Sequence, residues 1–398
     1  MEWDNYKNMT NLLPFLEASL AQFLNDLATL VNVDSGTYTK AGVDFCGEWV
    51  NARGQEWDWD MEYFPVREFG NCYMARLHGK GTGRILLITH LDTVYPPGVA
   101  AERPLRQEGT KLIGPGVSDM KAGVLAGMYA VRALQQAGVD SFDELQIFFC
   151  SDEEIGSPTS KKFYIPFVKK ADAVLVLEGA RANGNIVTAR KGVGKYTVRV
   201  HGHSAHAGVE PEKGANAILE LAHQIIALHR LNGVAPGVTV NAGIINGGTR
   251  ENVVPDEAVV RCDVRAIDPA GAQIAHDAIL QLAAHTHIER TRIEIEGEFE
   301  YPPMAKTPAI AFMAELAKET ARELGFTIND QSTGGASDAN NVAQFGIPVL
   351  DGLGPIGGLD HSPEEYLERE SIVPRVALLA GLIEKLLARQ GELAALRS

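Results

Sequence analysis

Short apolar segments alternate with longer segments of helical periodicity along the first half of the chain, and this alternation limits the fold more than any other feature. The short segments have the length and composition of buried strands; they are Arg84–Thr89, Leu145–Cys150 and Ala173–Leu177. The longer segments have apolar residues at helical spacing; they are Leu12–Val31, Met120–Gln136 and Ser160–Lys169. Because strands that alternate with helices build βαβ units, the sequence predicts an α/β fold with a mostly parallel sheet flanked by helices.

The pattern changes near Gly192, where Lys195–His201 alternates polar and apolar residues as a half-exposed antiparallel strand does. The region has the order strand, helix, strand, strand, helix, strand, which is that of a compact α+β, ferredoxin-like unit. Its later elements are expected at Asn216–His229, Gly237–Ile245, Ala258–Arg265, His276–His285 and Arg292–Glu298.

The βα alternation resumes after Pro302 and Pro303. Thr307 can cap a helix that has Pro308 at its first position and runs through Ala309–Leu324, and a buried strand follows at Ile347–Leu350. We therefore expect two domains. Residues 1–193 and 304–398 form the larger, catalytic domain, and residues 194–303 form a smaller domain inserted into it.

The composition excludes several classes of function. A net charge of −15 argues against nucleic acid or an anionic membrane surface as a partner, because both require a basic surface. No apolar run approaches the ~18 residues of a membrane span. The four cysteines are scattered, and the N-terminus lacks the basic and apolar regions of a signal peptide. We therefore expect reduced thiols in a cytoplasmic protein.

A histidine and an aspartate two residues apart follow the strand at Arg84–Thr89; they are His90 and Asp92. Side chains two residues apart on an extended segment point the same way. Asp92 can therefore accept the second imidazole N–H of His90 and fix the tautomer that binds a metal ion. The pair also has a simpler interpretation, in which His90 ends the strand and Asp92 begins a turn.

Two acidic segments favour the metal-binding interpretation. Asp119 lies in the glycine-rich segment Gly114–Gly123 at the entry to a helix, where it can bridge two cations or act as an N-cap. Asp152, Glu153 and Glu154 follow the strand that ends at Cys150. Three adjacent carboxylates repel one another unless a cation offsets them, although a solvated acidic turn is the alternative. In a two-metal hydrolase one member of such a pair binds metal, and the other moves a proton from the attacking water to the leaving amine.

Glu178 and His361 complete the set. Glu178 closes the strand Ala173–Leu177, and His361 lies in a glycine-containing loop near the last strand. Two histidines with three carboxylates suit Zn²⁺, with Co²⁺ or Mn²⁺ as possible substitutes. Because nearly all of these residues follow strands, where a parallel sheet presents its ligands, the sequence predicts a hydrolytic two-metal site.

Motifs spread in order along nearly the whole chain match one protein family. They are Thr89–Val94, Gly114–Gly123, Ser151–Ser157, Leu177–Glu178, Ser204–Gly208, Asn252–Pro255, Gly334–Asp338 and His361–Ser362. Through them the chain resembles the co-catalytic di-zinc metallopeptidases related to glutamate carboxypeptidase, acetylornithine deacetylase and succinyl-diaminopimelate desuccinylase. It resembles glutamate carboxypeptidase most.

The resemblance implies two Zn²⁺ ions per subunit and gives each residue of the site a role. The implied metal ligands are His90, Asp119, Glu154, Glu178 and His361. Asp119 would bridge the two ions, with His90 and Glu178 completing one site and Glu154 and His361 the other. Glu153 is the implied general base, and Asp92 is the implied residue that orients His90.

For the inserted domain the resemblance implies a lid that mediates a homodimer. His206 would reach the active site of the neighbouring subunit and donate a hydrogen bond to the developing oxyanion. Asn252 matches a residue that contacts substrate. Arg265 matches an arginine that holds a substrate carboxylate, with an ordinary surface arginine as the alternative. The amides of Gly334 and Gly335 could hold the same carboxylate, because glycine permits close approach.

The predicted function is hydrolysis of an amide or peptide bond next to a free carboxylate, on a small peptide or an N-acyl amino acid. Some relatives have an arginine just before the Pro-Pro-Met segment, where this chain has Tyr301, so a strict requirement for glutamate does not follow. One alternative is a deacylase of a small N-acyl amino acid, as in acetylornithine deacetylase. An alternative of another class is a non-catalytic binding relative.

Overall fold

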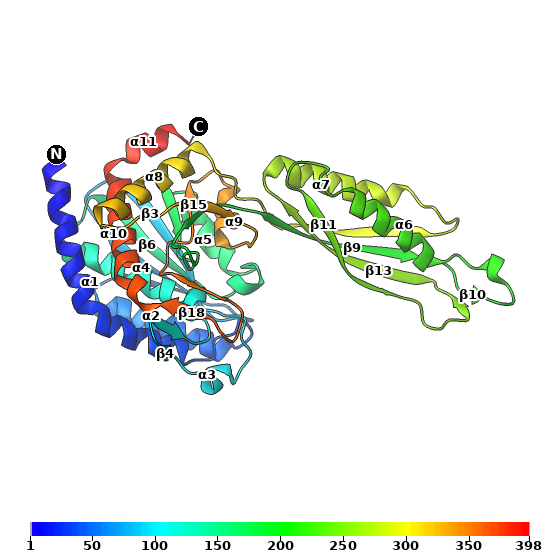
Figure 1. Cartoon of the computed structure of the whole chain (residues 1–398), viewed down its shortest axis with the longest axis horizontal. Coiled ribbons are helices and arrows are strands. Elements are labelled where there is room, and N and C mark those ends of the chain that lie inside the picture. Colours follow the sequence, from blue (N-terminus) through cyan, green and yellow to red (C-terminus); the bar gives the residue numbers. More distant parts are fainter. Residues whose placement is uncertain (1, 398) are drawn as a thin grey trace. The chain divides into compact units, whose positions relative to one another are not determined.

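The computed structural model describes the backbone of residues 2–397 and the side chains of residues 12–397. The chain divides into two compact units (Figure 1). The larger unit comprises the chain up to Thr188, residues 306–332 and the chain from Ser337 onward. The smaller unit comprises residues 189–305 and 333–336. It thus begins five residues before the expected position 194, and it includes the segment that carries Gly334 and Gly335.

A six-stranded sheet forms the centre of the larger unit, with the strand order β1-β2-β6-β3-β7-β16. The strands are β1 (Asp60–Phe64), β2 (Cys72–His78), β3 (Gly83–His90), β6 (Phe142–Cys150), β7 (Ala173–Val176) and β16 (Val349–Leu350). The neighbours β6, β3, β7 and β16 run parallel, whereas β1 and β2 are antiparallel additions at one edge. The predicted α/β fold with a mostly parallel sheet is therefore confirmed.

Helices cover both faces of this sheet (Figure 1). On one face, Gly127 of α4 lies against the side chains of Leu87 in β3 and Ile147 in β6. On the other, Tyr164 of α5 packs edge-on against Phe148, with ring centroids 5.6 Å apart. The helices are α1 (Glu2–Val31), α2 (Lys40–Glu56), α3 (Val99–Glu102), α4 (Ala122–Gln136), α5 (Ser160–Val168), α8 (Pro308–Glu323), α9 (Asp338–Ala343), α10 (Ile372–Ala388) and α11 (Gln390–Ala395).

Two local signals in the sequence explain how these helices begin and pack. Thr307 caps α8 as predicted, because its side chain accepts a hydrogen bond from the amide of Ile310. Gly123, which costs α4 some intrinsic stability, lets the helix lie against the end of β7. A Cβ atom at this position would stand 2.1 Å from the carbonyl oxygen of Leu177. The glycine therefore brings α4 up to the strand end that carries Glu178.

The smaller unit is a four-stranded antiparallel sheet with two helices on one face (Figure 1). Its elements are β9 (Gly192–His201), α6 (Ala217–Arg230), β11 (Thr239–Gly247), β13 (Glu257–Ala266), α7 (Pro269–Gln281) and β14 (Arg292–Tyr301). The strand order β11-β13-β9-β14 is that of a ferredoxin-like βαββαβ unit, the topology that the sequence predicts. Alternate residues of β9, including Val198 and Val200, point into a core shared with both helices.

The helix predicted at His276–His285 is wrong in its boundaries. Helix α7 begins at Pro269 and ends at Gln281. The side chain of Asp268 accepts a hydrogen bond from the amide of Gly271 and caps the helix, and proline occupies the first helical position. The Asp-Pro capping signal therefore sets where the helix begins, several residues before the apolar periodicity that the prediction followed.

The remaining strands are short. A second sheet of the larger unit has the order β17-β18-β5-β4, and β8 pairs with β15. The strands are β4 (Arg106–Glu108), β5 (Lys111–Ile113), β8 (Ile186–Arg190), β10 (Ala205–His206), β12 (Val253–Val254), β15 (Asp330–Thr333), β17 (Gly357–Gly358) and β18 (Tyr366–Glu368). Within residues 2–397, no helix combines the length and apolar character needed to cross a membrane.

Candidate metal centre

The candidate ligands gather at one edge of the central sheet because three parallel strands end there. β6, β3 and β7 are adjacent, and parallel strands have their carboxyl ends at the same edge. His90 is the last residue of β3. Glu153 and Glu154 form a 3-10 turn just after β6, and Glu178 lies two residues after the end of β7. The strand ends thus bring together residues that are far apart along the chain.

Asp119 lies between two histidines and presents one oxygen to each. Its Oδ1 is 3.1 Å from Nε2 of His90, and its Oδ2 is 3.1 Å from Nε2 of His361. Asp119 does not cap the following helix, because α4 begins at Ala122 with Lys121 in the N-cap position. The N-cap interpretation of Asp119 is therefore wrong, and both carboxylate oxygens face the site.

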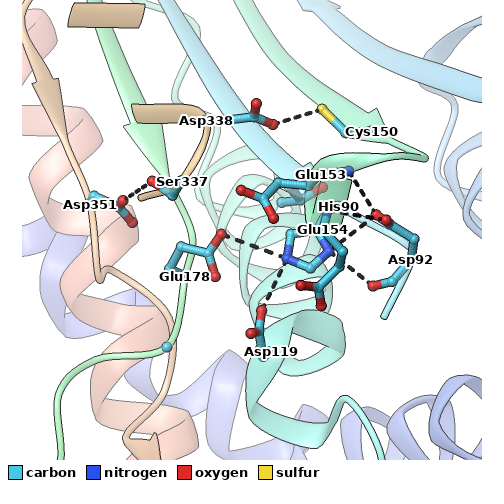
Figure 2. A network of polar contacts seen from close by, with 12 residues as sticks. His90, Asp92, Asp119, Cys150, Glu153, Glu154, Glu178, Ser337, Asp338 and Asp351 are labelled. Atoms are coloured by element: carbon cyan, nitrogen blue, oxygen red, sulfur yellow. Dashed lines mark hydrogen bonds and ion pairs between the residues drawn. The ribbon is translucent and has the colours of Figure 1, made fainter. Parts of the chain in front are cut away.

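The two glutamates divide between the histidines in the same way. Oε1 of Glu178 lies 3.6 Å from Nε2 of His90, and Oε2 of Glu154 lies 3.3 Å from Nε2 of His361. Ligand atoms of His90, Asp119 and Glu154 all lie within 4.8 Å of one another, and so do those of His90, Glu153 and Glu178. Figure 2 shows the carboxylates converging on the imidazole of His90. Each of these two groups of side chains could hold a metal ion.

Asp92 contacts the acidic turn as well as His90. Nδ1 of His90 lies 3.0 Å from the carbonyl oxygen of Asp92 and 3.4 Å from its carboxylate (Figure 2). The carboxylate also accepts hydrogen bonds from the amides of Glu153 (3.1 Å) and Glu154 (3.2 Å) and from the hydroxyl of Thr37 (2.6 Å). One buried aspartate therefore holds both the histidine and the acidic turn.

The site contains more carboxylates than its two histidines can neutralise, and its proton affinities reflect this. Burial raises the pKa of Glu153 well above its usual range, and burial with nearby Asp119 raises the pKa of Glu154 and Glu178 to about 7. Hydrogen bonds with Asp119 and Glu154 raise the pKa of His361 to about 10. In the metal-free protein these groups hold protons that a cation would displace.

The structure adds a buried aspartate that the sequence left without a role. Asp338 accepts hydrogen bonds from the hydroxyls of Ser157 (2.6 Å) and Tyr164 (2.7 Å) and from the thiol of Cys150 (3.2 Å). Figure 2 shows the contact with Cys150, at the end of the strand that leads to Glu153. Asp338 thus fixes both ends of the acidic turn. Its position in the Gly334–Asp338 motif was the only signal for it.

In the smaller unit, His206 lies on one strand of a short two-stranded ribbon, and Asn252 lies in the turn just before the other strand. His206 in β10 pairs with Val253 in β12, and the carbonyl of Asn252 accepts a hydrogen bond from the amide of Ala207 at 3.0 Å. Both side chains are exposed. Nδ1 of His206 accepts a hydrogen bond from the amide of Gly208 at 3.1 Å, so Nε2 is the nitrogen that carries the proton.

Arg265 lies beside the exposed glycines Gly334 and Gly335. Its Nη1 donates to the carbonyl of Gly334 at 3.2 Å, while Nε and Nη2 donate to the carboxylate of Asp263 at 2.7 and 2.8 Å. The guanidinium fork is thus already paired with a carboxylate.

A parallel α/β sheet whose strand ends carry this ligand set defines a metal-dependent hydrolase. The sequence profile of peptidase family M20/M25/M40 matches residues 86–385. The chain therefore belongs to this peptidase family and is a metallo-hydrolase.

The proteins that this chain resembles include a carboxypeptidase, a deacetylase and an aminopeptidase. Carboxypeptidase G2 of Pseudomonas sp. (strain RS-16) is 27% identical over 365 residues, covering 90% of this chain and 88% of that protein. Acetylornithine deacetylase of Proteus mirabilis (strain HI4320) is 27% identical over 365 residues, covering 87% of this chain and 89% of that protein. The crystal structure of aminopeptidase PepT from Bacillus cereus ATCC 10987 is similar with a TM-score of 0.77 at 25% identity, covering 93% and 99%.

Proposed function

We propose that this protein hydrolyses an amide or peptide bond next to a free carboxylate, with two divalent cations held at the candidate metal centre. The main observation that supports this proposal is the position of Asp119, whose two carboxylate oxygens each lie 3.1 Å from a different histidine. A carboxylate placed in this way can bridge two ions. The similarity to carboxypeptidase G2 supports this activity, because that protein is named as a carboxypeptidase.

The donor set fits Zn²⁺, with Co²⁺ or Mn²⁺ as substitutes, because it combines imidazole nitrogen with carboxylate oxygen. Oε1 of Glu154 is buried and has no hydrogen-bond partner among the described residues, which suits an oxygen reserved for a cation. Asp119 would bridge the ions, His90 and Glu178 would complete one site, and Glu154 and His361 the other. Bound zinc would supply a nucleophilic water at neutral pH and polarise the scissile carbonyl.

Glu153 is the residue that we assign to proton transfer. Burial raises its pKa well above the usual range, so its carboxyl group binds a proton more readily than an exposed glutamate does, as a residue that accepts a proton must. In this role it takes a proton from the attacking water and delivers it to the leaving amine. Asp92 keeps Glu153 in place through its backbone amide and keeps His90 aimed at the site.

The smaller unit would act as a lid and as a dimerisation domain. β11 is an edge strand of its sheet, and edge strands readily pair with a second chain. Ile244 and Ile245 on this strand, and Ile218, Leu219 and Ile226 on the neighbouring α6, expose large apolar side chains. These residues support a homodimer formed through the smaller unit.

His206 would donate a hydrogen bond from Nε2 to the oxyanion at the active site of the partner subunit. Mixing E153A and H206A subunits tests this role, because each variant supplies what the other lacks only if His206 acts across subunits. The mixture should then recover about a quarter of the wild-type activity, since half of the dimers are mixed and each has one intact site. No recovery in demonstrably mixed dimers would refute the cross-subunit role.

Asn252 is assigned a contact with the substrate, and Arg265 and the amides of Gly334 and Gly335 would hold its free carboxylate. Tyr301 replaces an arginine of some relatives, so we do not restrict the released residue to glutamate.

Exposed apolar side chains stand next to the candidate ligands in the chain. Val94 follows His90 by four residues, Ile155 follows Glu154, and Leu359 precedes His361 by two residues. They favour a peptide or a larger N-acyl group over a small acetyl group, because an apolar substituent would cover them. Deacylation of a small N-acyl amino acid is the second candidate, supported by the similarity to acetylornithine deacetylase.

A panel of dipeptides and N-acyl amino acids, assayed with added Zn²⁺ or Co²⁺ by the release of free amine, tests the function. We expect hydrolysis of compounds with a free carboxylate next to the amide, and none of the corresponding carboxamides. Equal rates for acids and carboxamides would contradict the carboxypeptidase assignment. A preference for N-acetyl compounds would favour the deacylase.

The scattered, buried free cysteines are in keeping with a cytoplasmic location, which remains part of this proposal.

A further inference from the structure

A buried glutamate joins the two loops that carry Asp119 and His361. Glu365 is 1% exposed and lies four residues after His361. Its Oε1 accepts hydrogen bonds from the amides of Ser118 (2.8 Å) and Asp119 (3.0 Å). Its Oε2 accepts from the amide of Gly116 (2.9 Å). The carboxylate is thus held by three amides of the loop that carries Asp119.

These amides form a concave cradle for an anion. Gly116 has a φ of +72°, in the left-handed region that favours glycine, and this turn directs the neighbouring amides toward one point. A Cβ atom at Gly116 would stand 2.6 Å from the side chain of Thr93. The backbone here is therefore shaped to bind a carboxylate, and Glu365 supplies it from the other loop.

Tyr95 adds a second connection. Its hydroxyl lies 2.7 Å from Oε2 of Glu365 and 2.9 Å from the carbonyl oxygen of Ser362, the residue directly after His361. The amide of Gly114 also reaches the carbonyl of Glu365 at 3.4 Å. Tyr95 therefore holds Glu365 and the residue after His361, and Gly114 ties the loop of Asp119 to the same segment.

His361 depends on these connections more than the other ligands do. Its side chain is 54% exposed, whereas that of Asp119 is 18% exposed and that of His90 is 1% exposed. Packing therefore fixes His90 but does little to fix His361. The distance from His361 to Asp119 must be set by the hydrogen bonds that anchor its loop.

We propose that Glu365 is a positioning residue that sets the distance between Asp119 and His361, and thereby the affinity of the cation site completed by Glu154 and His361. This inference rests on the proposed function. Glu365 touches neither the cations nor the substrate in this account. It acts through the amide of Asp119 and through the loop of His361.

The test compares E365Q with E364Q. Glutamine keeps the size of the side chain but loses the charge, and its NH₂ group would face backbone donors in the cradle. Glu364 is the exposed neighbour and serves as the matched control. In zinc titrations, E365Q should bind one of the two ions about 10- to 100-fold more weakly and the other with nearly unchanged affinity. E364Q should match the wild type, and the absorption spectrum of Co²⁺-loaded E365Q should change.

Hydrogen exchange in the metal-free protein provides a readout that does not depend on the cations. The amides of Gly116, Ser118 and Asp119 should exchange about 10- to 100-fold faster in E365Q, because they lose hydrogen bonds to a charged group. Y95F keeps the carboxylate in its cradle and should change both readouts in the same direction but less. It also serves if E365Q fails to fold.

The possible outcomes separate this inference from the proposed function. A wild-type protein that binds no pair of ions would refute the two-metal function, while the exchange rates would still decide whether Glu365 holds the loop. Unchanged exchange at the three amides would overturn the positioning role. So would equal weakening of both ions, which indicates a general loss of stability, or wild-type affinity for both.

Discussion

Both units of the molecule bury glutamates, and the two environments have opposite effects on them. In the smaller unit, Glu220 is fully buried and accepts hydrogen bonds from the amides of His287 (2.6 Å) and Ile288 (2.7 Å) and from Gln224 (2.7 Å). Burial acts to raise its pKa, but these donors lower it overall. In the larger unit, Glu178 is also buried, yet burial and the neighbouring Asp119 raise its pKa to about 7.

The difference teaches that burial alone does not mark a functional carboxylate. Glu220 has donors that match its charge, so it needs nothing further and stabilises the fold. Glu178 meets a histidine at 3.6 Å and is surrounded by other carboxylates, so its charge is only partly offset. A cation would complete the second environment and would add nothing to the first.

Removal of the metal ions should have the largest effect, and it should act on the larger unit, where the carboxylates need a cation. A chelator should abolish activity, because the activated water is lost. It should also lower the melting temperature, since bound ions stabilise the folded state. Activity should return with added Zn²⁺ or Co²⁺. Full activity in protein shown by elemental analysis to be metal-free would contradict the account.

Substitution of Glu153 should come next in size. E153A should lower kcat by about 10²- to 10⁴-fold, the usual contribution of a general base, while the zinc content stays at the wild-type level. E220Q is the matched control from the other unit and should leave kcat of the folded enzyme unchanged. Substantial turnover by a folded, metal-loaded E153A protein would remove Glu153 from the mechanism.

E220Q should instead reduce the free energy of unfolding by about 2 kcal/mol, because charged hydrogen bonds to backbone amides are lost. A carboxylate whose pKa is lowered by folding stabilises the protein above its unfolded pKa of about 4.3 and loses this contribution as the pH falls below it. The difference between the wild type and E220Q in urea unfolding should therefore be constant from pH 6 to 8 and shrink below pH 4. A difference that grew on acidification would reverse our assignment.

E178Q should have the smallest effect. It should increase the free energy of unfolding of the metal-free protein, whereas E220Q decreases it. In the metal-free protein the pKa of Glu178 is raised, so its contribution to stability is fully present below the unfolded pKa of about 4.3 and is lost as the pH rises through about 7. At pH 8, metal-free E178Q should be about 1 kcal/mol more stable than the metal-free wild type. The advantage should disappear near pH 4. Destabilisation at pH 8 comparable to that of E220Q would erase the distinction between the two units.

The sequence predicts those parts of the site that local pattern encodes. His90 ends an apolar strand, and Glu153 and Glu178 lie within three residues of the ends of two others, so the end of the strand also gives the place of the site residue. The relation between distant loops is different. Glu365 binds the amide of Ser118, which is 247 residues away along the chain, and no periodicity announces such a contact.

Two further departures have different causes, one local and one not. The start of α7 follows the Asp268 cap and Pro269, which outweigh the apolar spacing that placed the helix later. Gly334 and Gly335 belong with the smaller unit because Arg190 and Arg265 donate hydrogen bonds to their carbonyls. Both contacts depend on the folded arrangement of segments that are separate in the sequence.

The central claim is that Asp119 bridges two cations, one of them completed by Glu154 and His361. Its most direct test is the number of zinc ions per chain after loading and exhaustive dialysis of the wild type and H361A. The account predicts two ions in the wild type and one in H361A, with the fold retained in both. A single ion in the wild type, or two tightly bound ions in H361A, would contradict it.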